Sequence, residues 1–218
     1  MNFSGKRLSI LGDSISTYRG VSDDASANVT LYGYPYYYRP PFSLSKTYWK
    51  RVMDQFGLVL CVNNSWSGGN LSGRAVAHSG VNRARFLSNE RGEAPDVILV
   101  FMGINDLGRR VPLSEFAADY ERTLLILKEQ YPNASVCCVN LPDRDPFLKA
   151  DAERFNAAIS DAVRVAGDRF FVADLFHSAL NNDDYYNNTL DGLHPDEDGM
   201  RMIAEVVADA FARYAASC

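Results

Sequence analysis

The chain has 218 residues, of which 47% are hydrophobic and 22% are charged, with 15 glycines and 9 prolines. This composition excludes a disordered, collagen-like or coiled-coil protein, and the length favours one large α/β domain over two small ones. The formal net charge is −5, and the like charges are scattered rather than clustered, so we expect no nucleic-acid partner.

Five short apolar runs alternate with longer segments of helical period along the chain. The runs predict strands at residues 7–11, 58–62, 97–102, 135–141 and 170–175. This alternation is typical of βαβ units on a parallel sheet. The sequence shows no internal repeat, low-complexity tract or Pro/Ser-rich linker. We therefore expect a single doubly wound domain over residues 1–218.

The helical segments differ in how clearly they are marked. In the segment 113–131 apolar residues recur every three or four positions, Ser114 is expected to cap the helix, and Pro132 to end it. The segments at 150–165 and 196–214 have the same period. Two earlier helices are predicted at residues 46–56 and 71–87, the second of which includes His78.

Residues 17–45 do not fit the alternation. The segment has neither a helical nor a strand period, but it is rich in tyrosine and proline. Unstructured loops longer than about 15 residues are usually functional or disordered, and the aromatic density argues against disorder. We expect an ordered insertion directly after the first strand.

A serine follows the first predicted strand, in the sequence Gly12-Asp13-Ser14. In an open parallel sheet, ligands bind beyond the carboxyl ends of the strands, so the Ser14 hydroxyl is placed toward the expected site. The alternative is that Ser14 caps a helix and Asp13 fills a turn. The tripeptide alone does not decide between these interpretations.

Polar turns follow the second and third strands. Residues 63–70 form a turn that includes Gly68 and Gly69, and a backbone N–H from it could reach the same edge of the sheet. After the third strand, the side-chain amide of Asn105 could donate to a developing oxyanion. Its alternative role is to cap the next helix.

The last signal precedes the final helix, in Asp191-Gly192-Leu193-His194-Pro195. A tight turn of this length can place the carboxylate against one imidazole nitrogen, leaving the other nitrogen to accept a proton from a serine. For His78 and His177 we expect simple surface or packing roles. A metal interpretation lacks any recurring ligand spacing, and it would use Asp174, His177, Asp183 and Asp191.

These signals follow strand ends in the order Ser, Gly, Asn and Asp/His. Unrelated caps and turns would not be expected to occur in this order. At this point the sequence resembles the SGNH hydrolases, also called GDSL-like esterases and lipases. The resemblance spans nearly the whole chain. It is carried by Gly12-Asp13-Ser14-Ile15-Ser16, by the spacing from Asn63 to Gly68, by Gly103-Ile104-Asn105-Asp106 and by Asp191-Gly192-Leu193-His194.

The resemblance implies a role for each matched residue. Ser14 would be the nucleophile, His194 the general base and then acid, and Asp191 the residue that orients it. The N–H groups of Ser14 and Gly68 and the amide of Asn105 would form the oxyanion hole, although the adjacent Gly69 leaves the glycine donor open. The implied fold is a flavodoxin-like three-layer α/β/α sandwich with a five-stranded parallel sheet. No cofactor or metal is implied.

The insertion is expected to shape the substrate pocket because it directly follows Ser14. Tyrosine rings suit the faces of sugars better than they suit an acyl chain, which favours a carbohydrate O-acetylesterase or another short-chain esterase. The alternatives are a lysophospholipase or thioesterase, or a binding module that kept the fold and lost turnover. The tyrosines could instead pack against the domain or a partner subunit; the ones concerned are Tyr34, Tyr36, Tyr37 and Tyr38.

The sequence also bears on the cellular location of the protein. The longest apolar runs are far short of the ~18 residues that a membrane span requires, and the first residues lack the apolar stretch of a signal peptide. The four cysteines include the adjacent pair Cys137 and Cys138 and have no CxxC spacing, so we expect neither a disulfide framework nor a zinc site. We expect a cytoplasmic protein with no membrane anchor, and the sequence leaves the oligomeric state open.

Overall fold

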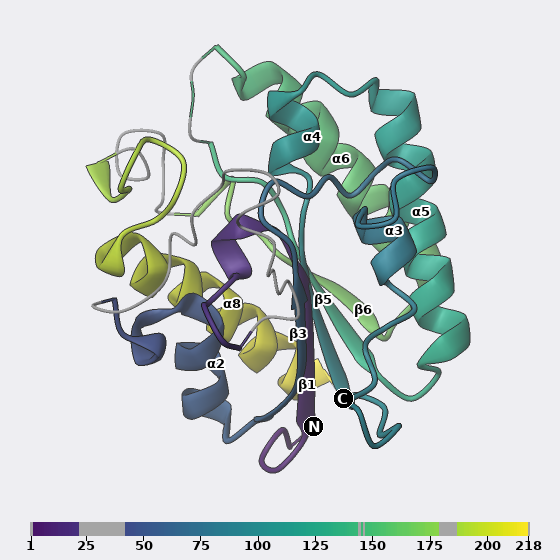
Figure 1. Cartoon of the computed structure of the whole chain (residues 1–218), viewed down its shortest axis with the longest axis vertical. Coiled ribbons are helices and arrows are strands. Elements are labelled where there is room, and N and C mark those ends of the chain that lie inside the picture. The colour runs from purple at the N-terminus through teal and green to yellow at the C-terminus, as the bar shows by residue number, and fades with distance from the viewer. Residues whose placement is uncertain (1, 22–41, 144, 146, 179–186, 218) are drawn as a thin grey trace.

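The computed structural model describes residues 2–21, 42–143, 145, 147–178 and 187–217 (Figure 1). Its sheet has five parallel strands in the order β3-β1-β4-β5-β6. The prediction of a five-stranded parallel sheet is confirmed, and the order matches the flavodoxin-like arrangement, in which the second strand in the chain lies at the edge. The strands are β1 (Arg7–Gly12), β3 (Val59–Ser65), β4 (Val97–Phe101), β5 (Ser135–Val139) and β6 (Phe170–Ala173).

Helices cover both faces of the sheet, so the predicted three-layer α/β/α sandwich is also confirmed. Figure 1 shows α2 and α8 on one face and α3 to α6 on the other. The helices are α2 (Tyr48–Phe56), α3 (Gly80–Arg83), α4 (Ile104–Gly108), α5 (Leu113–Gln130), α6 (Lys149–Ala166) and α8 (Glu197–Ser217), and two 3-10 turns are η1 (Ser14–Ser16) and η2 (Leu44–Lys46).

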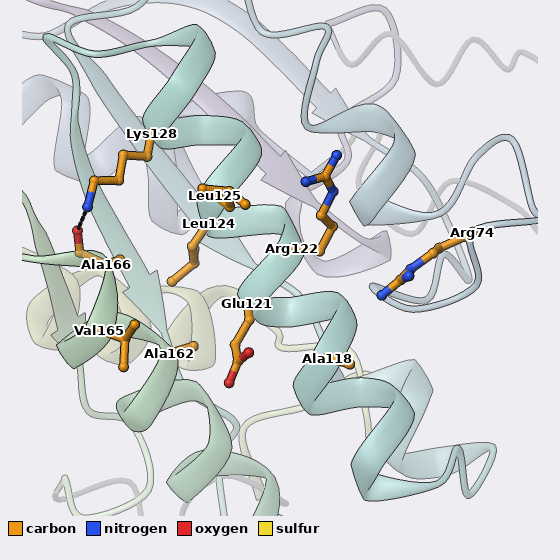
Figure 2. A pocket seen from close by; sticks show the side chains of 10 residues that line it. All are labelled: Arg74, Ala118, Glu121, Arg122, Leu124, Leu125, Lys128, Ala162, Val165 and Ala166. Carbon is orange, nitrogen blue, oxygen red and sulfur yellow. Dashed lines mark hydrogen bonds between the residues drawn. The ribbon is translucent and has the colours of Figure 1, made fainter.

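Helices α5 and α6 lie side by side on their face of the sheet (Figure 2). Phe116 of α5 packs on Phe155 of α6 with ring centroids 4.4 Å apart. At the other end of the pair, Lys128 Nζ donates to the carbonyl oxygen of Ala166 at 2.8 Å. The carbonyl of Ala166 is among the last of α6, so no later N–H of the helix can donate to it. The lysine donates in place of that N–H.

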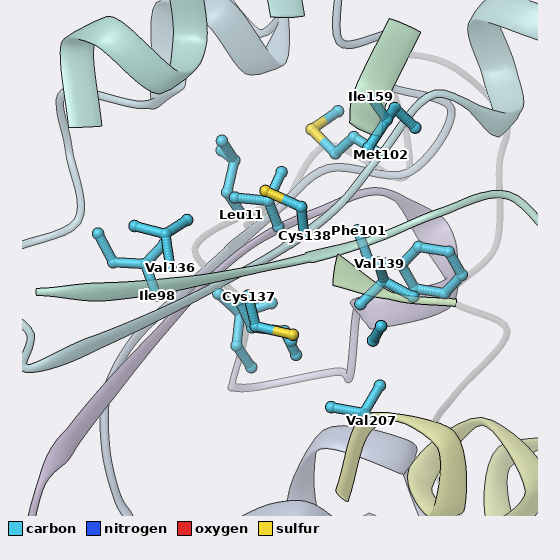
Figure 3. Packing of buried hydrophobic residues seen from close by; sticks show 14 of the residues in the cluster. Leu11, Ile98, Phe101, Met102, Val136, Cys137, Cys138, Val139, Ile159 and Val207 are labelled. Carbon is cyan, nitrogen blue, oxygen red and sulfur yellow. The ribbon is translucent and has the colours of Figure 1, made fainter. Parts of the chain in front are cut away.

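The core is built by alternation along the strands. Figure 3 shows the neighbouring residues Cys137 and Cys138 of β5 pointing to opposite faces, Cys138 toward Met102 and Ile159 and Cys137 toward Val207 of α8. Because helices cover both faces, the central strand β4 (Val97–Phe101) is apolar and buried at every position, as such a parallel strand requires. Both cysteines are buried and free of disulfide bonds.

The predicted helix over residues 71–87 is wrong, because only Gly80–Arg83 is helical. At the start of the segment, the N–H groups of Leu71 and Ser72 donate to the carboxylate of Asp106 at 2.7 and 2.9 Å. The Asp106 carboxylate thus satisfies two buried backbone N–H groups at the start of a segment that runs mainly as a loop.

The start of α5 also differs from the prediction. Pro112 occupies the N-cap position, and its carbonyl accepts the N–H groups of Glu115 and Phe116 at 3.0 Å. Ser114 lies inside the helix and does not cap it. The fixed φ of proline holds the chain at the helix entrance, so the cap does not need a serine hydroxyl. The sequence also predicts no helix at 104–108, where α4 is found.

Only the two ends of the predicted insertion fall within the described residues. Tyr18 is buried, and its hydroxyl donates to the carbonyl of Phe42 at 2.8 Å, so the chain leaves and returns at one place. Tyr34, Tyr36, Tyr37 and Tyr38 lie outside the described residues. Among the helices that the structure describes, none is both long and apolar enough to cross a membrane.

Gly199, in the first turn of α8, packs against the segment that precedes the helix. A Cβ at this position would collide with the carbonyl oxygen of Asn188 and lie 2.9 Å from Cβ of Pro195. Since the first of these is a backbone atom, the whole segment would have to shift. We predict that Gly199→Ala lowers the free energy of unfolding by about 1–3 kcal/mol, measured by urea denaturation.

The matched control is Gly108→Ala in α4, where an added Cβ meets no atom within 4 Å. Both changes gain up to about 1 kcal/mol of helix propensity. The control variant should therefore be at least as stable as the wild type, and equal stability of the two variants would contradict the close packing at Gly199.

Candidate active site

The site lies at the carboxyl edge of the sheet, where β1 runs into the short η1 turn. Asp13 caps this turn, since its carboxylate accepts the N–H of Ile15 at 3.0 Å. Ser14 is the first residue of the turn and is buried. The capping role considered for Ser14 therefore belongs to Asp13, and the Ser14 hydroxyl is available for another partner.

That partner is His194. Its Nε2 lies 2.9 Å from Oγ of Ser14, and its Nδ1 lies 2.8 and 3.1 Å from the two carboxylate oxygens of Asp191. His194 is only 4% exposed, whereas the Asp191 side chain is 38% exposed at the rim. The structure thus brings together the three residues predicted to cooperate, in the order serine, histidine, aspartate.

The turn that carries Asp191 and His194 is held by its own backbone. The N–H groups of Leu193 and His194 donate to Asp191 Oδ1 at 3.1 and 2.8 Å, and the N–H of Gly192 donates to the Thr189 hydroxyl at 2.9 Å. Partial burial raises the pKa of Asp191, but the bonds from His194 and Leu193 outweigh it and hold the pKa below its usual value. An ionised carboxylate then keeps the proton of His194 on Nδ1, so that Nε2 presents its lone pair to Ser14.

The backbone donors predicted for the oxyanion hole can be compared directly. The N–H of Gly69 donates to the carbonyl of Trp66 at 2.9 Å and is therefore already used in the turn. Within the described part of the chain, the N–H groups of Ser14 and Gly68 have no protein acceptor. Gly68 has a φ of +70°, which suits glycine. The structure therefore favours Gly68 over Gly69 as a donor.

Asn105 lies at the start of α4, just after the end of β4. Its Nδ2 donates to the carbonyl of Gly69 at 3.0 Å and lies 3.4 Å from Oδ2 of Asp13. The amide is thus anchored both to the turn after β3 and to the residue before Ser14. An amide NH2 has two protons, so Asn105 can donate to an oxyanion only by releasing one of these partners, and the longer contact with Asp13 is the weaker of the two.

Two buried charges that the sequence analysis missed tie these strand ends together. The guanidinium of Arg83 donates to the carbonyl of Gly12 at 2.9 Å and to Asn64 Oδ1 at 3.2 Å. Asp106 is fully buried and, besides two backbone N–H groups, contacts the hydroxyl of Ser72. Asp106 stands in the matched block 103–106, but no role was predicted for it, and Arg83 stands in no marked pattern. The partners of both are mainly backbone groups far away in the sequence.

Asp13 has the most unusual environment. Burial raises its pKa from 3.8 to about 7; the N–H of Ile15 and the charge of Arg83 oppose the rise, and the charge of Asp106 adds to it. A carboxyl that is partly protonated at neutral pH therefore lies directly before Ser14.

The other candidate residues do not join the site. His177 forms a separate, exposed pair with Asp174, with 2.9 Å between Nδ1 and Oδ2. His78 lies in a turn rather than in a helix and stacks on Trp66. Of the residues of the metal interpretation, Asp183 lies outside the described residues. In the part of the chain that the structure describes, no three His, Cys, Asp or Glu side chains are placed to hold a metal ion.

Two hollows of similar size differ in their relation to this site. One of about 430 Å³ lies over α5 and α6 and is lined by Leu125, Val165 and charged residues, but by none of the predicted site residues (Figure 2). The other, of about 420 Å³, has Gly68 and Asn70 in its wall. Only the second adjoins the candidate oxyanion hole.

The raised pKa of Asp13 makes stability depend on pH. Between the unfolded pKa of 3.8 and the folded pKa of about 7, the folded protein binds more protons, so the stability contributed by Asp13 is lost as pH rises. Asp13→Asn removes this ionisation and keeps an oxygen for the N–H of Ile15. We predict that the unfolding free energy of the variant, minus that of the wild type, rises by up to about 4 kcal/mol between about pH 4 and pH 7.

Urea denaturation of both proteins at several pH values in this range measures that difference. Taking the difference removes the pH dependence that the other groups contribute to both proteins. A difference that stays constant with pH would contradict the raised pKa of Asp13.

Comparison with known proteins agrees with this geometry. A model of the GDSL-like lipase/acylhydrolase family matches residues 10–202, and no curated protein sequence matches the chain. One similar solved structure is a GDSL-like lipase from Bacteroides ovatus. It is 22% identical, the match covers 96% of this chain and 99% of that one, and the TM-score is 0.73.

Two further similar structures are carbohydrate esterases of family 2. One is from Clostridium thermocellum, in complex with cellohexaose. It is 15% identical, the match covers 97% of this chain and 65% of that one, and the TM-score is 0.70. The other is from Corynascus thermopiles. It is 17% identical, the match covers 99% of this chain and 68% of that one, and the TM-score is 0.68. At these identities the likeness shows the shared fold. The family match runs from β1 into α8 and includes all four sequence blocks, so the chain belongs to the GDSL-like lipase/acylhydrolase family.

Proposed function

We propose that the protein is a serine esterase that hydrolyses small acyl esters through Ser14, His194 and Asp191. The observation that carries the proposal is the continuous hydrogen-bonded series from Ser14 Oγ through the imidazole to the Asp191 carboxylate. A buried histidine held between a carboxylate and a serine hydroxyl is the arrangement that activates serine as a nucleophile. Membership of a hydrolase family supports the same conclusion.

The acylation step follows from this geometry. Oγ of Ser14 attacks the ester carbonyl carbon while its proton passes to Nε2 of His194, and Asp191 stabilises the imidazolium that forms. The carbonyl oxygen becomes an oxyanion, which accepts hydrogen bonds from the N–H groups of Ser14 and Gly68 and from the amide of Asn105. When the tetrahedral intermediate collapses, His194 gives its proton to the leaving alkoxide, and the acyl group remains on Ser14.

Deacylation repeats the same steps with water. His194 takes a proton from the water molecule as its oxygen attacks the acyl carbon, and the same donors hold the second oxyanion. Collapse returns the proton to Oγ of Ser14 and releases the carboxylic acid. The cycle uses only side chains and backbone groups of this chain and requires no cofactor.

For the substrate, we propose a carbohydrate O-acetyl ester or another short-chain ester. Two similar solved structures are family 2 carbohydrate esterases, one in complex with cellohexaose. The tyrosine-rich segment that follows Ser14 in the sequence favours sugars for the reason given above. A lysophospholipase or thioesterase is the second candidate, because another similar structure is a GDSL-like lipase. Relative rates on esters from acetyl to palmitoyl separate the two.

Ser14→Ala and His194→Ala test the esterase proposal. We predict that each lowers kcat on p-nitrophenyl acetate by about 10³-fold or more, since the residues of such a series act as a unit. Circular dichroism and urea denaturation should show that Ser14→Ala still folds, because the change removes one hydroxyl at a strand end. Wild-type kcat in a folded Ser14→Ala variant would refute the assignment, and a wild type that hydrolyses no ester would favour the binding-module alternative.

A further inference from the structure

A hollow lies beside Gly68, whose N–H is a proposed oxyanion donor. Its walls come from the segment that follows β3, from Arg109 after α4 and from Glu115 in α5. Its volume of about 420 Å³ is within the range of about 300–1,000 Å³ that is usual for small-molecule sites. Gly68 belongs both to this wall and to the proposed oxyanion hole, so the hollow adjoins the proposed hole at this residue.

One wall of the hollow is aromatic and fixed in place. Trp66 and His78 stack with ring centroids 4.9 Å apart and an angle of 20° between the rings. The backbone of Trp66 is anchored as well, since its N–H donates to the carbonyl of Gly12 at 3.1 Å and its carbonyl accepts from Gly69 at 2.9 Å. A half-buried indole held in this way offers a flat apolar surface without first having to be ordered.

The polar groups of the hollow suit hydroxyl groups. Arg109 Nη1 donates to the carbonyl of Gly68 at 2.6 Å and contacts Asn70 Oδ1. A guanidinium has five N–H donors, so others remain for a ligand. Glu115, which also lines the hollow, supplies acceptors and a charge opposite to that of Arg109. Because these two formal charges cancel, the lining favours a neutral ligand with both donors and acceptors over an anion.

We propose that this hollow binds the sugar ring of the substrate, with the ring against Trp66 and its hydroxyls toward Arg109, Asn70 and Glu115. The inference rests on the proposed esterase function and adds the place where the sugar binds and the residues that recognise it. A neutral pyranose has an apolar C–H face and a rim of hydroxyls that both donate and accept, which matches the lining described. The sugar is then the alcohol part of the ester, and the acetyl group lies at Ser14.

Kinetics on three esters test this placement: methyl 6-O-acetyl-glucopyranoside, p-nitrophenyl acetate and p-nitrophenyl octanoate. We expect Trp66→Ala to lower kcat/KM for the acetylated sugar at least about tenfold more than for p-nitrophenyl acetate, chiefly through KM. Val76→Trp, a change at a half-exposed residue of the lining, should have the same selective effect by filling the hollow. This second variant decides the matter if Trp66→Ala does not fold.

The matched control is Phe86→Ala, which removes an aromatic ring that is 67% exposed and outside the hollow; it should change none of the three rates. Equal losses on all esters, or no loss on the sugar ester, would overturn the proposal. A selective loss on the octanoate would also overturn it, because the hollow would then hold the acyl chain.

Fluorescence gives a readout that does not need turnover. The chain has two tryptophans, and Trp49 is 1% exposed in the core, so Trp66 is the one that a ligand can contact. Titrating Ser14→Ala with the acetylated sugar should change indole emission, and adding Trp66→Phe should abolish the change. No change in either protein would overturn the sugar site. A wild type that hydrolyses no ester, together with a positive titration, would contradict the esterase proposal and leave the sugar site standing.

Discussion

The hydrogen bond of 2.9 Å between Ser14 and His194 joins residues 180 positions apart, and the candidate site exists only where the fold holds both ends still. Ser14 is held from the β1 side, by the η1 turn. His194 is held by its own turn and by α8, whose Gly199 packs closely on the segment that precedes the helix. The start of α8 is in turn tied to α2, since the N–H of Tyr48 contacts the buried sulfur of Met200 at 3.4 Å. The docking of α8 on the sheet therefore sets the geometry of the proposed chemistry.

The second requirement is that three strand-end turns approach one another without losing their backbone hydrogen bonds. Arg83 satisfies carbonyl oxygens in the last residues of β1 and β3, and Asp106 satisfies N–H groups of the segment that leads to α3. Asp13 is buried at the same edge, and its own burial, which the charge of Arg83 only partly offsets, disfavours its ionised form. The edge of the sheet thus combines a well-satisfied backbone with one carboxyl whose charge is costly, as often occurs where a protein positions polar groups for chemistry.

The sequence predicts the elements that local patterns mark, and it misses those that depend on contacts between distant residues. Apolar runs marked all five strands, and an apolar period marked the helices α5, α6 and α8, so these elements were predictable. The approach of Ser14 and His194 was predictable because parallel strands end at one edge. The segment 71–87 and the short α4 were not predictable. The start of the first is fixed by bonds to Asp106 and Asp119, which are distant in the sequence, and α4 is shorter than the pattern needed to detect a helix. The hollow beside Gly68 depends on the stacking of Trp66 on His78 and on the bond from Arg109 to Gly68, which no spacing in the sequence reveals.

The claim that Ser14 is an activated nucleophile is tested most directly by covalent labelling. A fluorophosphonate reacts with such a serine when Oγ attacks phosphorus and fluoride leaves, and the product is stable enough to locate by peptide mass spectrometry. The account predicts that the native protein gains one phosphonyl group, on Ser14 alone, in step with the loss of esterase activity. It also predicts that His194→Ala reacts far more slowly, because no base then takes the Ser14 proton. Loss of activity with the label on another residue, or full activity with Ser14 labelled, would contradict it.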